Sequence, residues 1–362
     1  MTDNPGFEPE FSTGSNPSSE RSSPQNEPVH PQAAADPVSR ETSEDGGFRV
    51  RTAADIAVAA PAFDDDHATP LARAAEHVVL ARAGVRLRPA MARPDRTRVF
   101  VVANQKGGVG KTTSTVNVAA ALAQLGQRVL VIDLDPQGNA STALGVEHRR
   151  GVPSTYDALV DGVPLADVVS ASPEGESLWV VPATIDLAGA EIELVSVVAR
   201  EGRLRKAIHG HPWVGAAADV GEERFDYVFV DCPPSLGLLT LNALVAGDEM
   251  LIPIQAEYYA LEGLGQLLET VEMVRAHLNQ GLDVSTILVT MYDARTRLAS
   301  GVAEEVREHF GERVLRTTIP RSVRVSEAPS YGQTVMTYDP GSPGALSYLE
   351  AAREIAVQGA PQ

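Results

Sequence analysis

The chain has a single cysteine, no long apolar run and fewer basic than acidic side chains. With Cys232 alone, no disulfide can form within the chain and no cysteine cluster can hold a metal, which suits the cytosol. There is no run of 18 apolar residues and the first residues are polar and acidic, so neither a membrane span nor a signal peptide is expected. The net charge of −18 argues against a protein that coats nucleic acid over its whole surface, but leaves room for a local basic patch.

The composition divides the 362 residues into three segments. Residues 1–66 are rich in Pro, Ser, Asp, Glu and Asn, so we expect a disordered acidic arm that cannot bury enough apolar surface to offset the entropy of ordering. Residues 67–97 are predicted to form a short helix and an Arg-rich linker, with Thr69-Pro70 as the helix start. The helix either packs on the edge of the core or docks a partner, and the linker is either solvated or contacts DNA. Residues 98–358 are then the folded domain.

From residue 98 onward, apolar runs typical of strands alternate with helical stretches. The runs are continuous rather than alternating, as in strands that are covered on both faces. Strands are expected at 99–104, 128–133, 178–182, 227–231, 250–254, 285–290 and 314–317, and helices at 112–125, 190–207, 238–243, 261–278, 301–309 and 344–356. This order predicts an α/β fold, a doubly wound, mostly parallel sheet with helices on both faces, whose ligands bind at the carboxyl ends of the strands.

Residues 209–224 are predicted to be a surface insertion on the side of the sheet away from those carboxyl ends. The segment contains His209 and His211, and two histidines without a further ligand nearby are more often loop residues than a metal site.

The most informative stretch is Gln105 to Thr113, QKGGVGKTT, which lies between the first predicted strand and the first predicted helix. This is the context of a phosphate-binding P-loop, in which backbone N–H groups and a helix N-terminus attract phosphate. Lys111 is expected to neutralise the β- and γ-phosphates, and the Thr112 hydroxyl to hold Mg²⁺. The loop departs from the usual motif because Gln105 replaces its first glycine and a second lysine, Lys106, opens it.

Two other predicted strands end in an aspartate. Asp133 ends one of them and is soon followed by Asp135, and a strand-terminal acid beside a P-loop can orient water or Mg²⁺. Asp231 ends the other in the form of a Walker B motif. The loop through Ser235 to Gly237 is a candidate switch that senses the γ-phosphate. A single such acid is more often a helix cap or a surface turn, but three elements in this order favour a nucleotide site.

These motifs resemble the signatures of the ParA (Soj-type) partition ATPases. KGGVGKTT at 106–113 resembles their deviant Walker A motif, which an extra lysine opens. The likeness continues through 133–140, 182–191, 231–237, 257–264 and 319–330, and it covers roughly residues 98–357.

The resemblance implies ATP and Mg²⁺ as cofactors, weak intrinsic ATPase activity and a homodimer that sandwiches the nucleotide. Lys106 would reach the nucleotide of the partner subunit, Lys111 would bind phosphate in its own subunit, and Asp135 would position the attacking water. Thr112, Asp231 and Asp133 would form the Mg²⁺ shell. The implied ATP-binding residues are Lys106, Gly107, Gly108, Val109, Gly110, Lys111, Thr112, Thr113 and Pro320.

The resemblance also implies partners and a location. In this family the ATP-bound dimer binds DNA without sequence preference, and a ParB-like protein stimulates hydrolysis. Arg295 and Arg324 match DNA-contacting positions, with Arg297 and Arg321 as further candidates, although each of them could equally form an ordinary salt bridge. The implied location is the cytoplasm, in association with the nucleoid.

Three other interpretations are open. A MinD-like positioning ATPase needs a basic amphipathic C-terminal helix, whereas 346–358 carries two Glu and one Arg, so no membrane partner is expected. A redox member of the superfamily needs cysteines from two motifs, and Cys232 is alone. A cargo or polarity scaffold, recruited through the N-terminal arm, would be an additional role.

Overall fold

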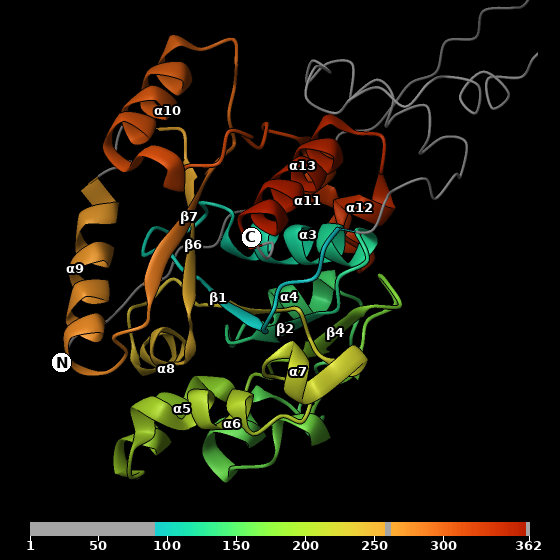
Figure 1. Cartoon of the computed structure of the whole chain (residues 1–362), viewed down its shortest axis with the longest axis vertical. Coiled ribbons are helices and arrows are strands. Elements are labelled where there is room, and N and C mark those ends of the chain that lie inside the picture. Colours follow the sequence, from blue (N-terminus) through green and yellow to red (C-terminus); the bar gives the residue numbers. More distant parts are fainter. Residues whose placement is uncertain (1–90, 258–261, 360–362) are drawn as a thin grey trace, which may run out of the picture. The chain divides into compact units, whose positions relative to one another are not determined.

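The computed structural model describes residues 91–257 and 262–359, so the predicted acidic arm and the predicted helix of 67–97 lie outside the described residues. The described residues form a seven-stranded sheet in the order β3-β4-β2-β5-β1-β6-β7, with helices on both faces (Figure 1). Every neighbouring pair is parallel except β3 and β4. The predicted α/β class with a mostly parallel sheet is confirmed.

The bounds of the elements are as follows. The strands are β1 (Arg98–Val102), β2 (Val129–Asp133), β3 (Ser170–Ala171), β4 (Leu178–Val181), β5 (Tyr227–Asp231), β6 (Glu249–Gln255) and β7 (Asp283–Thr290). The helices are α3 (Lys111–Gln124), α4 (Asn139–Ala143), α5 (Leu187–Glu193), α6 (Arg203–His209), α7 (Ala217–Val220), α8 (Leu238–Ala246), α9 (Glu262–His277), α10 (Arg297–Phe310), α11 (Val323–Glu327), α12 (Val335–Tyr338) and α13 (Pro343–Gln358). Short 3₁₀ turns and one π-helical turn, Asp157–Asp161, join them.

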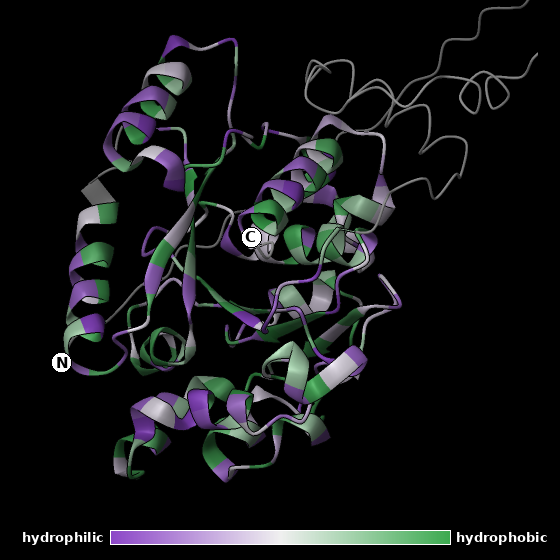
Figure 2. Cartoon of the chain, viewed as in Figure 1, coloured by the Kyte–Doolittle hydropathy of each residue, from purple (hydrophilic) through white to green (hydrophobic). Residues whose placement is uncertain are grey.

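Strand β1 explains why the apolar runs are continuous. Its alternate side chains enter two separate cores: Val99 and Val101 pack with α5, α6, α8, α9 and α10, whereas Phe100 and Val102 pack with α3, α4, α11, α12 and α13. The central strands and the inner faces of the helices are correspondingly apolar in Figure 2. Each large apolar side chain buried in this way contributes about 1.5–3 kcal/mol.

Two predicted elements differ from the structure. The helix expected at 190–207 is broken between α5 and α6, because Val197 is extended and Ala199 adopts a left-handed φ of 54°. The strand expected at 314–317 is reduced to a single parallel bridge between Val314 and Ile287 of β7. The two-residue β3, which has no pattern long enough to detect, was not expected.

The segment predicted as an insertion packs on the chain that leads into β1. Thr97 donates its backbone N–H to the carbonyl oxygen of Gly215 at 2.8 Å, and Ala217 donates to that of Asp95 at 2.7 Å. His211 is buried, its ring centroid lies 5.1 Å from that of Phe225, and burial lowers its pKa. The segment therefore covers the amino end of the sheet.

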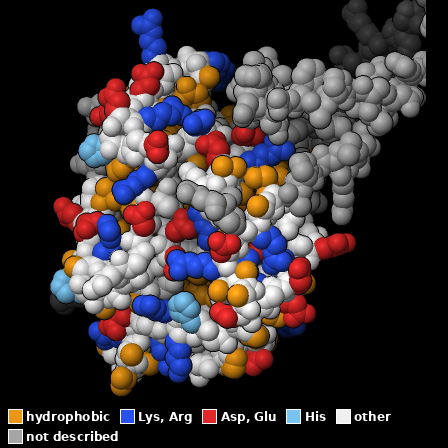
Figure 3. Space-filling view, in the orientation of Figure 1, with side chains coloured by type: hydrophobic (Ala, Val, Ile, Leu, Met, Phe, Trp, Pro, Cys, Tyr) orange, Lys and Arg blue, Asp and Glu red, His pale blue; other side chains and the backbone are white. Residues whose placement is uncertain are grey.

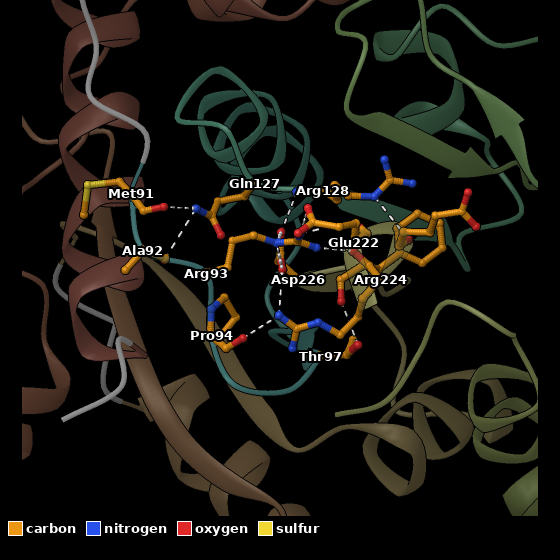
Figure 4. Close-up of polar contacts among 12 residues, drawn as sticks. Met91, Ala92, Arg93, Pro94, Thr97, Gln127, Arg128, Glu222, Arg224 and Asp226 are labelled. Atoms are coloured by element: carbon orange, nitrogen blue, oxygen red, sulfur yellow. Dashed lines mark hydrogen bonds and ion pairs between the residues drawn. The ribbon is translucent and has the colours of Figure 1, made fainter. Parts of the chain in front are cut away.

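The Arg-rich linker is anchored to the same region. Arg93 Nε lies 2.8 Å from Oδ1 of the fully buried Asp226, and Arg224 donates to the same carboxylate at 3.1 Å (Figure 4). Arg98, at the start of β1, pairs with Glu249 at 2.6 Å. The solvated interpretation of the linker is therefore wrong for Arg93, because its guanidinium joins a buried ion pair.

Candidate nucleotide-binding site

The loop between β1 and α3 has the backbone of an anion cradle. Gly108 and Gly110 have φ values of +74° and +89°, a region that strains other residues, so both positions require glycine. Gly110 is the N-cap of the 14-residue α3, no side chain caps this end, and the first turn holds no acid. The first N–H groups of α3 and its dipole are therefore available to an anion.

Neighbouring strands fix the shape of this loop. Thr290, the last residue of β7, donates its hydroxyl to the carbonyl oxygen of Val109 at 2.8 Å. Asn104 donates its side-chain amide to the carbonyl oxygen of Pro253 in β6 at 2.8 Å and accepts from the backbone N–H of Lys106 at 3.0 Å. The loop is thus set at the carboxyl ends of β1, β6 and β7, where the fold predicts a ligand.

Lys111 is 7% exposed and folds back over the loop. Its Nζ donates to the carbonyl oxygen of Lys106 at 3.3 Å. Burial lowers the pKa of Lys111, and the negative charges of Asp231 and Asp135 partly oppose this. A buried ammonium beside open N–H groups is suited to hold a phosphate charge.

Asp231 lies opposite the start of α3. Its Oδ2 accepts from the Thr112 hydroxyl at 2.7 Å and its Oδ1 from the Thr115 hydroxyl at 2.8 Å. Complete burial, followed by the charge of Asp133, raises the pKa of Asp231 to about 8. Thr112 and Asp231, both predicted as Mg²⁺ ligands, are therefore joined by a direct hydrogen bond.

Asp133 faces Asp231 across the β2–β5 pair but has its own partners. Its Oδ2 accepts from the backbone N–H and the hydroxyl of Ser141, at 2.8 and 2.7 Å, and its Oδ1 from the N–H of Asp135 at 3.2 Å. Burial raises its pKa to about 6. These bonds hold the loop that carries Asp135, so the geometry favours a positioning role for Asp133 over the predicted metal role.

Asp135 is 7% exposed, and its charge acts on both Lys111 and Asp231. Its own Oδ1 accepts from the N–H of Gln137 at 3.0 Å. The predicted trio of Lys111, Asp135 and Asp231 is therefore gathered at the carboxyl ends of β1, β2 and β5.

Lys106 is directed differently from Lys111. Its Nζ lies 3.1 Å from Oε2 of Glu257, just beyond β6, and both side chains are partly exposed. A Cβ added at Gly107 would meet nothing within 4 Å. A side chain at Gly107 would therefore find room within the described part of the subunit.

Some residues of this region carry no sequence signal. Thr115 lies one turn after Lys111, and only the helical repeat places its hydroxyl beside Asp231. Thr290, at the end of β7, and Glu257, just beyond β6, are far from the loop along the chain, and the sequence could not link them to it. Pro320, predicted to touch the nucleotide, forms a parallel bridge with Tyr292 directly after β7, and Thr113 lies in the first turn of α3.

The four candidate DNA-contacting arginines are exposed but do not form one cluster. Arg295 pairs with Asp293 at 2.8 Å, which lowers the pKa of Asp293 to about 2, and the charge of Arg321 contributes to that shift. Arg324 pairs instead with Glu327 and Asp339, and Arg297 begins α10. Basic and acidic side chains are interspersed over the face drawn in Figure 3.

Residues 91–257 and 262–359 hold no group of three or more His, Cys, Asp or Glu that could bind a metal. No helix in the same ranges is long and apolar enough to cross a membrane. Cys232 is buried, and burial raises the pKa of its thiol well above the usual value.

Comparisons with known proteins agree with this geometry. Residues 97–284 match the family described as AAA domain. The chain is 51% identical over 262 residues to the sporulation initiation inhibitor protein Soj of Bacillus subtilis, covering 72% of this chain and 99% of that protein. It is 49% identical over 260 residues to the chromosome-partitioning ATPase Soj of Thermus thermophilus, covering 72% and 96%.

Solved structures show the same fold. One is described as cobyrinic acid a,c-diamide synthase from Mycobacterium smegmatis with bound ADP and magnesium; it is 38% identical, has a TM-score of 0.58, and the match covers 71% of this chain and 93% of that one. The ATP complex of a McdA variant from Cyanothece, at 23% identity and a TM-score of 0.62, supports the fold alone; that match covers 74% and 98%. From the identity and coverage of the curated relatives, the chain belongs to the Soj/ParA family of chromosome-partitioning ATPases.

Proposed function

We propose that this protein is the ATP-driven switch of a DNA-partition system, acting in the cytoplasm on the nucleoid. With ATP it forms a homodimer that binds DNA without sequence preference, and hydrolysis, stimulated by a ParB-like partner, releases it. The observation that carries this proposal is that the two lysines of the loop point to different places. Lys111 lies over its own phosphate cradle, whereas Lys106 is turned away to Glu257.

The donor set fits ATP with Mg²⁺. The open N-terminus of α3 and the Lys111 ammonium supply positive charge for the phosphates. The Thr112 hydroxyl and the Asp231 carboxylate are the oxygen ligands that Mg²⁺ prefers, and with only these two the ion would keep waters and phosphate oxygens. The cation, when bound, neutralises charge on the transferred phosphoryl group.

The remaining residues position the reaction. We assign Asp135 to hold the attacking water, since it lies within electrostatic reach of Lys111 and Asp231. Asp133 fixes the backbone of Asp135 and so orients that carboxylate. In phosphoryl transfer the protein contributes mainly by aligning the nucleophile, and not by forming covalent bonds.

In the proposed dimer, Lys106 binds the nucleotide of the facing subunit. Its ammonium is partly exposed and held by one partly exposed carboxylate, a contact worth little in water, so it is free to exchange Glu257 for a phosphate of the facing subunit. A cation supplied in trans completes the site only when two subunits meet, which couples assembly to ATP.

For DNA binding we propose the surface around the carboxyl end of β7. Arg295 pairs with Asp293, the charge of Arg321 contributes to the lowered pKa of that carboxyl, and Arg297 and Arg324 lie on α10 and α11. Contacts of arginine with phosphate are independent of sequence and weaken with salt, so a few of them suffice despite the acidic total.

A binding assay tests the proposal. The full-length protein should co-sediment with non-specific duplex DNA in the presence of ATP but not of ADP, and should not co-sediment with anionic liposomes in either state. Arg295→Ala with Arg324→Ala should lower the slope of log affinity against log salt by about 2, one unit for each lost phosphate contact.

Arg313→Ala is the matched control, because Arg313 is also exposed and paired, with Asp283 at the amino end of β7. An unchanged salt slope in the double variant would place the DNA surface elsewhere. Binding to liposomes instead of DNA would favour the MinD-like alternative.

A further inference from the structure

The loop that follows the Walker B aspartate, Cys232 to Gly237, ends against a carboxylate from another helix. Glu191 of α5 accepts a hydrogen bond from the backbone N–H of Leu239, in the first turn of α8, with Leu239 N and Glu191 Oε1 3.4 Å apart. Gly237 is the N-cap of α8 and offers no side chain to that turn. Glu191, which is distant in the sequence, therefore supplies the negative charge that stabilises the start of a helix.

The packing at Gly237 shows how closely Glu191 approaches this loop. A Cβ built on Gly237 would overlap the Glu191 Oε1. The backbone of Gly237 is extended, with φ −80° and ψ −167°, a conformation open to any residue. Gly237 thus leaves room for the Glu191 carboxylate, while its backbone conformation does not itself require glycine.

The other end of the same loop is held by the nucleotide site. Asp231, which precedes it, accepts from Thr112 and Thr115. Within the loop, the carbonyl oxygen of Ser235 accepts from the Thr240 hydroxyl of α8 at 2.6 Å. The loop therefore spans from Asp231 to the start of α8, and Glu191 provides a contact from outside this segment at its far end.

We propose that Glu191 is a positioning residue for ATP hydrolysis: it anchors the start of α8 and so holds the Cys232–Gly237 loop in the arrangement that hydrolysis requires. It touches neither phosphate nor water. Because Glu191 already orders the loop before the reaction, less conformational entropy is lost when the loop takes its reactive arrangement. The proposal rests on the ATPase site described above.

Single-site variants of the full-length protein give the first test. Glu191→Ala should lower the single-turnover rate of ATP hydrolysis about 3- to 10-fold, the scale of one ordinary hydrogen bond, because the contact is long at 3.4 Å, with the KM for ATP unchanged. Glu191→Gln should recover most of the rate, because its amide oxygen can accept from Leu239. Glu193→Ala is the matched control on the same helix, since Glu193 is exposed and its carboxylate accepts from Tyr156 rather than from α8.

A double-mutant cycle separates positioning from folding. Gly237→Ala should displace the flexible end of Glu191 and reproduce the rate of Glu191→Ala without strain in the backbone. Gly237→Ala with Glu191→Ala should then be no slower than either single variant, because the contact is lost only once. Full additivity, or a normal rate in Glu191→Ala, would overturn the proposal.

The affinity for a fluorescent ADP analogue is measured in parallel. Normal affinity together with an unchanged rate in Glu191→Ala refutes the role of Glu191 alone. Failure of the unsubstituted protein to bind this analogue with Mg²⁺ would instead refute the proposed nucleotide site.

Discussion

At the scale of single residues, Asp231 is a buried carboxyl whose pKa the fold shifts strongly. It is fully buried, its acceptors are filled by two hydroxyl groups, and its pKa is raised to about 8. An aspartate in an unfolded chain titrates near pH 3.9, so the folded state holds a proton that the unfolded state has lost over the interval between these values. The stabilising contribution is present below about pH 4 and is lost as the pH rises through about 8.

This shift predicts how Mg²⁺-nucleotide binding depends on pH. A cation requires the ionised carboxylate, so binding releases a proton and the affinity for Mg²⁺-ADP should rise from about pH 6.5 to about pH 8.5. Isothermal titration calorimetry in two buffers of different ionisation enthalpy measures both the affinity and the released proton. Asp231→Asn should bind more weakly and lose this pH dependence; retention of the full dependence would show that another group titrates.

Thr115 yields a second prediction at this scale. Thr115→Val keeps the shape of the side chain but leaves Oδ1 of the buried Asp231 without its donor, which should cost about 1–3 kcal/mol of unfolding free energy. Urea denaturation measures this cost. Thr270→Val of α9 is the control, because the Thr270 hydroxyl also bonds the carbonyl oxygen four residues earlier but is exposed, and it should cost under about 0.5 kcal/mol. Equal costs would mean that the bond to Asp231 contributes nothing.

The residues of the site were predictable to different degrees. Lys111 and Thr112 follow from the spacing of one strand–loop–helix unit, and Asp231 from the separate motif of an apolar strand that ends in an acid; the structure brings the three together. The partners of Asp133 were not predictable, because the choice of its carboxylate between Mg²⁺ and Ser141 depends on side-chain direction within a tight loop. The contact between Glu257 and Lys106 depends on which strand lies beside β1, which no local pattern determines.

At the scale of elements, the amino end of the sheet is closed by the chain that enters β1 and by the segment that precedes β5. Arg93 is the polar centre of this contact, since it reaches the buried Asp226 and the carbonyl oxygen of Arg224 (Figure 4). Trp179, Trp213 and Phe225 pack edge to face beneath it, and the guanidinium of Arg128 lies over Trp179. Of the two histidines of this segment, His211 belongs to this aromatic layer, whereas His209 is exposed at the end of α6.

Arg93→Ala should therefore destabilise the fold without affecting nucleotide binding. Asp226 would keep Arg224 and the N–H of Arg128, so the expected cost is about 1–2 kcal/mol rather than that of a fully unpaired buried charge. Urea denaturation gives the cost and ADP titration the affinity, which should stay within about twofold because the site lies at the opposite ends of β1 and β5. Arg96→Ala, at an exposed neighbouring position, should change neither quantity. A loss of ADP affinity in Arg93→Ala would show that the two ends of the sheet are coupled.

At the scale of the whole molecule, continuous apolar runs were sufficient to predict a sheet covered on both faces. They could not give the strand order, because every central strand is equally apolar and the order depends on which helix covers which face. The break in the helix expected at 190–207 was not predicted either, because it depends on the extended Val197 and the left-handed Ala199, which no sequence pattern marks. The arm at 1–66 and the helix expected at 67–97 stay predictions, because nearly all of their residues precede Met91, where the described chain begins.

The central claim is that the loop contains one lysine for its own nucleotide and one for the nucleotide of a partner subunit. Lys106→Gln should bind ADP within about twofold of the unsubstituted protein, since its ammonium contacts Glu257 rather than the cradle, but should fail to dimerise. Lys111→Ala is the matched variant and should lose nucleotide binding altogether.

The most direct measurement is sedimentation velocity of the full-length protein with a non-hydrolysable ATP analogue and Mg²⁺. We predict a dimer for the unsubstituted chain and a monomer that still carries nucleotide for Lys106→Gln. A Lys106→Gln protein that dimerises normally, or one that fails to bind nucleotide just as Lys111→Ala does, would contradict the assignment of Lys106 to the partner subunit.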